Sequence, residues 1–117
     1  VYGNGTQTRC FSLVSEVVDC ALALMSSEDA VGQVVNIGST QEITILELAR
    51  RVKEISGSSS SISMIPYEEA YPTDFEDMQR RVPDVSKLKS LAGVCPSANI
   101  DEIIETIIRA GIPEGEG

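Results

Sequence analysis

The sequence contains no histidine and no tryptophan, and its three cysteines, Cys10, Cys20 and Cys95, lie far apart. Without histidine and without a C-x-x-C pair, the ligand sets that usually bind zinc cannot form. The odd number and wide spacing of the cysteines give no disulfide framework, so we expect all three to be reduced and largely buried. The sequence therefore predicts neither a zinc centre nor a disulfide-stabilised fold.

Long apolar runs and basic residues are also scarce. No stretch approaches the roughly 20 apolar residues that span a bilayer, and no basic start leads into an apolar run as in a signal peptide. We therefore expect a cytoplasmic protein that does not contact membranes. Nine Lys and Arg against eighteen Asp and Glu give a net charge of −9. Because nucleic acids and anionic membranes bind basic surfaces, neither is expected as a partner.

The patterns that catalytic and metal sites need are missing as well. The acidic segment 68–77 (EEAYPTDFED) has no regular ligand spacing and no glycine-hinged loop, so we expect no metal site. No nucleophile has an adjacent base. None of the three tyrosines has a lysine four positions later, because those positions hold Thr6, Tyr71 and Phe75. We therefore assign no catalytic residue.

What remains has the composition of one soluble globular domain. Of the 117 residues, 42% are hydrophobic and 23% are charged. These fractions are ordinary for a folded chain, and the length allows one modest core. We expect residues 1–117 to form a single domain, with a frayed tail at 111–117.

Four segments have the apolar spacing of amphipathic helices. They are residues 15–25 with Ser15 as N-cap, 44–56, 85–92 between Asp84 as N-cap and Gly93, and 100–110. The second is the clearest, because Thr44 and Glu47 form a T-x-x-E capping box and Gly57 stands where a left-handed C-cap is expected. The isoleucine stripe from Ile100 to Ile108 is predicted to face the core, with a missing lobe or a second copy as the alternative.

Short strands separate these helices. We predict a strand or strand-like turn within 6–14, an apolar strand at Val34–Ile37 and a third strand at 61–65. Residues 56–61 and 66–79 are expected to be loops. Three to four helices and a few short strands predict an α/β fold, with an α+β arrangement as the alternative. Because Val34–Ile37 is apolar except for Asn36, this strand is typical of a sheet that is covered on both faces.

The opening loop, VYGNGTQTRC, has two explanations. Gly3 and Gly5 begin a G-x-G, but Thr8 stands where a Rossmann fingerprint needs its third glycine. The glycines could instead let backbone N–H groups face an anion while Arg9 pairs bidentately with phosphate. A plain surface turn explains the same residues.

The segment QRRVPD, at 79–84, raises the same choice. Pro83 biases Val82 toward extended backbone and could thereby hold Arg81 in a fixed direction. A solvated pair of arginines that balances the preceding acidic residues is the simpler explanation.

Three blocks in order, VYGNGTQTRCFSLVSEVVD, VVNIGSTQEITILELARRVKEISG and EDMQRRVPDVSKLKSLAG, resemble the C-terminal portion of the extended short-chain dehydrogenase/reductase family. The branch they resemble contains the NAD-dependent nucleotide-sugar epimerases, dehydratases and UDP-glucuronate decarboxylases. The resemblance covers Val1 to about Arg109. It also implies a set of residues that contact the nucleotide sugar. These are Tyr2, Gln7, Arg9 and Arg81, with Arg80 as an accessory residue.

The sequence also departs from the family. It contains neither the G-x-x-G-x-x-G dinucleotide loop nor the Y-x-x-x-K catalytic pair, and it lacks the tryptophan of the G-W-x-P block. Leu13 replaces a common aromatic residue, and Glu16 replaces a common aspartate. We therefore expect a partial C-terminal lobe of the extended fold, without the N-terminal Rossmann part.

The resemblance implies the nucleotide-sugar-binding portion of an epimerase, dehydratase or decarboxylase, which binds a UDP- or dTDP-sugar weakly and is not catalytic by itself. NAD(P) is implied for the full-length family, and no cofactor is expected in this chain. The expected partner is a second copy, in a homodimer, or the missing Rossmann lobe, because without that lobe Val34, Val35 and Ile37 would face water. A truncated module that self-associates without a ligand and a small α/β domain with no ligand are the alternatives.

Overall fold

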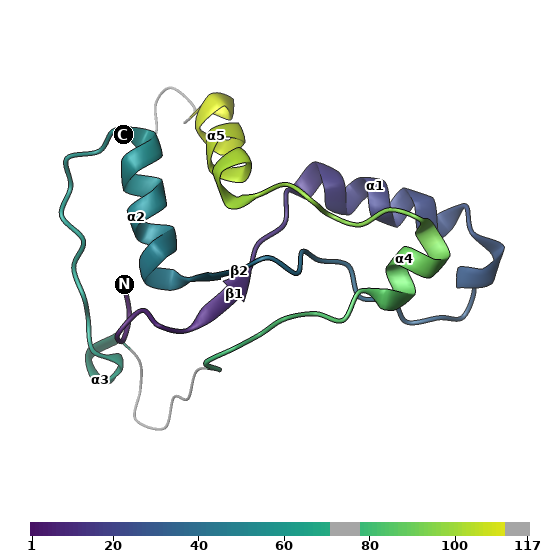
Figure 1. Cartoon of the computed structure of the whole chain (residues 1–117), viewed down its shortest axis with the longest axis horizontal. Helices are drawn as coiled ribbons and strands as arrows, with labels where there is room; N and C mark the ends of the chain where they lie inside the picture. The colour runs from purple at the N-terminus through teal and green to yellow at the C-terminus, as the bar shows by residue number, and fades with distance from the viewer. Residues whose placement is uncertain (71–77, 112–117) are drawn as a thin grey trace. The chain divides into compact units, whose positions relative to one another are not determined.

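A computed structural model describes residues 1–70 and 78–111 of the chain (Figure 1). The chain divides into two compact units, each built from separate segments. Unit 1 contains Val1–Thr8, Ile43–Arg80 and Ile100–Gly117, and unit 2 contains Arg9–Glu42 and Arg81–Asn99. Of the tail that we predicted to fray, residues 112–117 lie outside the described residues, as do residues 71–77 of the predicted acidic loop.

The strands β1 (Thr8–Cys10) and β2 (Glu42–Thr44) pair in a two-stranded sheet. The strand predicted within 6–14 is therefore confirmed as β1, whereas β2 was not predicted. Together with five α-helices and one short 3-10 helix among the described residues, this sheet gives the mixed α/β composition that the sequence predicted. None of the described helices is both long enough and apolar enough to cross a membrane.

Helix α2 (Ile45–Ser56) of unit 1 begins and ends as predicted. The Oγ1 atom of Thr44 accepts a hydrogen bond of 3.1 Å from the backbone N–H of Glu47, so Thr44 is the N-cap. Gly57 has a φ of 67°, the left-handed conformation of a C-cap glycine. The carboxylate of Glu47 lies 3.7 Å from Nη1 of Arg50, one turn further along the helix.

Helix α5 (Ile100–Ala110) packs against α2 in unit 1. Ile103 and Ile104 are buried, which confirms the prediction for the first half of the stripe, whereas Ile107 and Ile108 are exposed. The apolar spacing therefore continues beyond the buried part of α5. The second half of the stripe therefore lies outside the core of unit 1.

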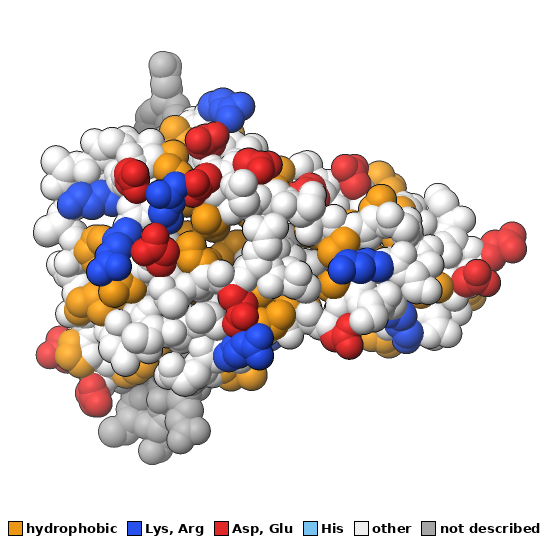
Figure 2. Space-filling view, in the orientation of Figure 1, with side chains coloured by type: hydrophobic (Ala, Val, Ile, Leu, Met, Phe, Trp, Pro, Cys, Tyr) orange, Lys and Arg blue, Asp and Glu red, His pale blue; other side chains and the backbone are white. Residues whose placement is uncertain are grey.

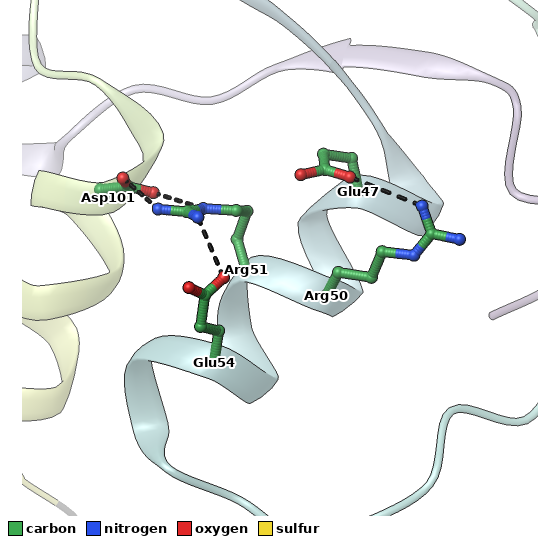
Figure 3. Close-up of polar contacts among 5 residues, drawn as sticks. All are labelled: Glu47, Arg50, Arg51, Glu54 and Asp101. Carbon is green, nitrogen blue, oxygen red and sulfur yellow. Dashed lines mark hydrogen bonds and ion pairs between the residues drawn. The ribbon is translucent and has the colours of Figure 1, made fainter.

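Arg51 of α2 joins the two helices through a bidentate pair with Asp101 of α5 (Figure 3). Its Nε atom donates to Oδ1 of Asp101 at 2.9 Å, and Nη2 binds the second carboxylate oxygen. Nη1 also lies 3.0 Å from Glu54. The hydrogen bonds that Arg51 donates to Asp101, followed by the negative charge of Asp101, raise the pKa of Arg51. Figure 2 shows basic and acidic side chains next to one another on this part of the surface.

The segment before residue 71 differs from the prediction. Instead of a loop throughout, it contains the short helix α3 (Tyr67–Ala70), which starts after Pro66. The carbonyl of Pro66 accepts hydrogen bonds from the N–H groups of Glu69 and Ala70. The strand predicted at 61–65 is reduced to one parallel bridge between Tyr2 and Ile65. The carbonyl of Ser63 also accepts a hydrogen bond of 2.8 Å from the N-terminal ammonium group of Val1.

Unit 2 contains α1 (Val14–Met25), the 3-10 helix η1 (Glu28–Ala30) and α4 (Ser86–Ala92). Cys20, Val85 and Leu88 form its core, and α1 packs against α4. Helix α4 ends at Gly93, as predicted, but the prediction of Asp84 as its N-cap is wrong, because Val85 holds that position. Asp84 accepts hydrogen bonds from the N–H and the hydroxyl of Ser86, the first residue of the helix. Both bonds lower the pKa of Asp84, and the bond from the hydroxyl has the larger effect.

The N-cap prediction for α1 is wrong. The helix starts one residue earlier than expected, at Val14, so Ser15 lies inside the first turn, and the N-cap residue is Leu13, which provides no side-chain hydrogen bond. A favourable N-cap side chain is therefore not what sets the start of this helix.

The strand predicted at Val34–Ile37 is also absent from the structure. A strand needs a hydrogen-bonded neighbour, and no described segment pairs with these residues in a sheet. Val35 and Ile37 instead pack against the core of unit 2, whereas Val34 is 86% exposed. The expectation that all three side chains face water is therefore correct only for Val34.

The three cysteines carry free thiols, as the sequence predicted. Cys20 is buried, and burial, the largest cause, raises the pKa of its thiol. Cys10 and Cys95 are only half-buried.

Candidate anion-binding site

Arg9 and Arg81, the two arginines that were predicted to contact the nucleotide sugar, line one cavity of about 410 Å³ in unit 2. Arg9 comes from β1 and is half-buried, whereas Arg81 comes from the exposed segment that leads into α4. The two residues are 72 positions apart in the sequence, so the fold of unit 2 brings them together. The remaining lining residues are Cys10, Ser12, Asn36, Ile37, Gly38, Ser39, Val82 and Pro83.

One wall of this cavity is the segment 36–39, which polar contacts hold in place. The N–H of Ser39 donates to Oγ of Ser12 at 2.9 Å, and Oγ of Ser39 accepts from the N–H of Gln41 at 3.1 Å. Ser39 is only 1% exposed. Because its backbone and its hydroxyl are both engaged, this end of the wall has a fixed position.

Close packing fixes the middle of the wall. A Cβ atom at Gly38 would lie 3.2 Å from Cγ of Pro83, which is tighter than nearly all Cβ contacts. The carbonyl of Gly38 accepts a weak hydrogen bond from the thiol of Cys95 at 3.8 Å. Glycine is therefore the residue that lets the wall approach the Val82–Pro83 segment next to Arg81.

The start of the wall is tied to the same segment. Nδ2 of Asn36 donates to the backbone carbonyl of Asp84 at 3.4 Å. The residues before α4 are thus held against the wall from two sides, by Gly38 and by Asn36. This arrangement gives the chain next to Arg81 a defined path.

The chemistry of the cavity suits an anion with several oxygens. Guanidinium groups stay protonated at any physiological pH, and their planar forks pair bidentately with phosphate or carboxylate oxygens. The chain carries a net charge of −9. The lining of this cavity nevertheless contains two positively charged side chains. The described residues contain no group of three His, Cys, Asp or Glu side chains that could hold a metal ion.

Tyr2 and Gln7, the other two predicted site residues, lie together in unit 1. Nε2 of Gln7 donates to the hydroxyl of Tyr67 at 2.9 Å and to the backbone carbonyl of Tyr2 at 3.4 Å. Gln7 is 5% exposed, and its Oε1 atom is buried without a hydrogen-bond partner. The structure thus brings the four predicted residues together as two pairs, one in each unit. The accessory residue Arg80 belongs to unit 1.

Several residues around these pairs were not predicted from the sequence. The ring of Tyr67 packs on Gly3, where a Cβ atom would lie 2.5 Å from the ring, so it fixes the opening loop as well as Gln7. Ser12 and Ser39 were missed because hydroxyls in turns follow no periodic pattern. The available signal was the position of Ser39, directly after a glycine that ends an apolar run.

The chain matches no protein-family model. It is similar to a UDP-N-acetyl-alpha-D-glucosaminuronate decarboxylase from Bacillus cytotoxicus, with 39% identity over 109 residues, which cover 93% of this chain and 34% of that relative. It is also similar to UDP-glucuronic acid decarboxylase 1 from Xenopus tropicalis, with 40% identity over 102 residues, which cover 87% of this chain and 22% of that relative.

Solved structures show the same likeness in fold. The chain superimposes on a UDP-glucuronic acid 4-epimerase from Bacillus cereus, in complex with UDP-glucuronic acid and NAD, with a TM-score of 0.73 and 24% identity. The matched part covers 90% of this chain and 32% of the epimerase chain. The chain therefore spans about a third, or less, of the length of the proteins that it matches.

Proposed function

This chain is a homologue of one part of the nucleotide-sugar decarboxylases and epimerases of the extended short-chain dehydrogenase/reductase family, and from that premise we propose that it is a nucleotide-sugar-binding portion of such an enzyme. Its ligand is a UDP- or dTDP-sugar. The relatives that are named for their substrates act on UDP-sugars, which favours uridine.

The cavity that Arg9 and Arg81 line is the observation that carries this proposal. A nucleotide sugar is recognised in part through its diphosphate, whose negative oxygens pair with guanidinium groups. The family resemblance assigned both arginines to the nucleotide sugar, and the cavity that both of them line supports a contact with its diphosphate. Tyr2 and Gln7 remain predicted contacts of the same nucleotide sugar.

The chemical step needs groups that this sequence does not contain. In the family, NAD(P) carries the hydride chemistry and a Y-x-x-x-K pair moves the proton, and neither that pair nor the dinucleotide loop is present here. The proposed part of this chain is to bind and orient the nucleotide sugar. We therefore expect the chain alone to show no turnover of a UDP-sugar in the presence of NAD.

Titration of the chain with UDP by calorimetry tests the proposal. We expect saturable binding, and Arg81→Ala and Arg9→Ala should each weaken it by about tenfold or more, because a charge-assisted hydrogen bond contributes about 1.5–3 kcal/mol. Arg50→Ala, which removes an exposed arginine of α2 outside the cavity, is the matched control and should bind as the original chain does. Loss of affinity in the control, or equal affinity in all four proteins, would contradict the proposal.

Self-association is the second candidate function, and an exposed apolar stripe on α1 favours it. Val14, Val18, Leu22 and Met25 recur at helical spacing, and they are between 49% and 83% exposed. Contiguous apolar surface of this kind usually becomes an interface. A second copy or a cofactor-binding lobe would bury the stripe.

A further inference from the structure

We propose that Ser12 is a third ligand-contacting residue of the cavity, and that its hydroxyl donates a hydrogen bond to a phosphate oxygen held by Arg9 and Arg81. This inference rests on the proposed function and deepens it. Ser12 lines the same cavity as the two arginines. It follows Arg9 by three residues and lies directly before the N-cap of α1.

The hydrogen bond between Ser12 and Ser39 determines what the Ser12 hydroxyl can do. Oγ of Ser12 accepts the backbone N–H of Ser39 at 2.9 Å, and Ser39 is almost fully buried. A serine hydroxyl has one proton to donate in addition to its lone pairs. Because a lone pair faces Ser39, the proton of Ser12 points elsewhere. The structure shows no second hydrogen-bond partner for this side chain among the described residues.

Gly38 lies next to this hydroxyl on the lining of the cavity. A Cβ atom at position 38 would lie 4.0 Å from Oγ of Ser12, an ordinary van der Waals distance, so any side chain there would begin beside the hydroxyl. With glycine, the donor adjoins the cavity that carries the two guanidinium groups. A neutral donor in the same cavity as two cations suits a diphosphate, which offers several oxygens to bind.

The competing explanation is that Ser12 only supports the wall of the cavity through Ser39. The two roles differ in the group that they need. Support of the wall requires an acceptor at position 12, whereas contact with phosphate requires a donor. Ser12→Ala removes both, Ser12→Thr keeps both, and Ser12→Cys keeps a side chain of similar shape that is a weak donor and a weak acceptor. Stability therefore reports the acceptor role toward Ser39, and affinity for phosphate reports the donor role.

The test titrates the chain and its variants with UDP, with inorganic pyrophosphate and with uridine. We expect Ser12→Ala and Ser12→Cys to weaken binding of UDP and of pyrophosphate by roughly tenfold, and Ser12→Thr to restore both. Binding of uridine, which has no phosphate, should not change. Ser90→Ala, at an exposed serine of α4, is the control and should bind all three as the original chain does. The melting temperature of each variant shows separately how much stability is lost with the hydrogen bond between Ser12 and Ser39.

The outcomes separate this inference from the proposed function. If Arg81→Ala loses UDP and Ser12→Cys binds UDP and pyrophosphate normally, the role of Ser12 is overturned and the proposed function stands. A loss for UDP without a loss for pyrophosphate also overturns the phosphate contact. If the original chain binds neither UDP nor pyrophosphate, both the inference and the proposed function are overturned. If Ser12→Ala fails to fold, the affinity of Ser12→Cys for UDP and pyrophosphate decides whether Ser12 contacts phosphate.

Discussion

Glu16, at the residue scale, is a carboxylate that holds two distant segments of unit 2 together. Its Oε2 accepts the N–H of Ser97 at 3.0 Å and its Oε1 accepts the N–H of Ala98 at 2.8 Å, so the first turn of α1 fixes the chain that follows α4. From the sequence alone, Glu16 was visible only as a departure from the family's common aspartate. Its role became visible from the structure, because its partners are more than 80 residues away.

The backbone hydrogen bonds from Ser97 and Ala98 lower the pKa of Glu16 below its ordinary value of 4.5, and the bond from Ser97 has the larger effect. The folded chain therefore binds this proton less tightly than the unfolded chain does. It follows that the stabilising contribution of Glu16 is complete above pH 4.5 and is lost as the pH falls through the lower folded value. We expect Glu16→Gln to reduce stability at pH 7 and to flatten the acid side of the stability profile.

Urea unfolding between pH 3 and pH 7 measures this effect. Glu28→Gln, an exposed carboxylate of η1, is the control and should leave the profile of the original chain unchanged. If the profiles of Glu16→Gln and the original chain run parallel over the whole range, the bonds to Ser97 and Ala98 do not stabilise the fold.

The candidate site shows what could be predicted at this scale. Arg9 and Arg81 followed from the family resemblance, because charged residues in short ordered blocks are recognisable one by one. Their placement on one cavity, the wall at Gly38 and Ser39, and the partners of Gln7 depend on contacts between residues far apart in the sequence. No local pattern carries that information.

At the scale of the element, the helices were predictable wherever apolar spacing and capping residues agreed. For α2, Thr44 and Gly57 took the predicted roles, whereas the carboxylate of Glu47 lies near Arg50 and only its backbone N–H takes part in the cap. The wrong strand predictions have a common cause, because a strand forms only where a second segment is available to pair with it. Val34–Ile37 has the composition of a strand and β2 does not, yet only β2 finds a neighbour in the described chain.

The cap of α2 gives a prediction for this scale. Thr44→Ala should lower the free energy of unfolding by about 1 kcal/mol, because the backbone N–H of Glu47 loses its acceptor. Thr44→Ser keeps an oxygen in the same place and should stay close to the original chain. Urea unfolding of the three proteins provides the comparison, and equal midpoints for Thr44→Ala and Thr44→Ser would exclude a stabilising cap.

At the scale of the whole molecule, the α1 stripe predicts that the chain associates. Sedimentation equilibrium should give a mass that rises from monomer toward dimer with concentration, because the exposed apolar side chains of α1 would then be buried. Leu22→Glu, in the middle of the stripe, should restore the monomer mass by placing a charge in the interface. Ser90→Glu adds the same charge to α4 of the same unit and should associate as before. A constant monomer mass up to high micromolar concentration would contradict self-association.

The division of unit 1 into separate segments also affects how the chain is made. Arg51 and its partner Asp101 are 50 residues apart, which a ribosome working at roughly 5–20 residues per second translates in about 3–10 s. During that interval α2 is complete while α5, the helix that packs against it, does not yet exist. Unit 2 ends at Asn99 and has all its residues before α5 is begun. The unit that carries the two arginines can therefore fold first, and the apolar side of α2 is meanwhile available to a chaperone that binds nascent chains.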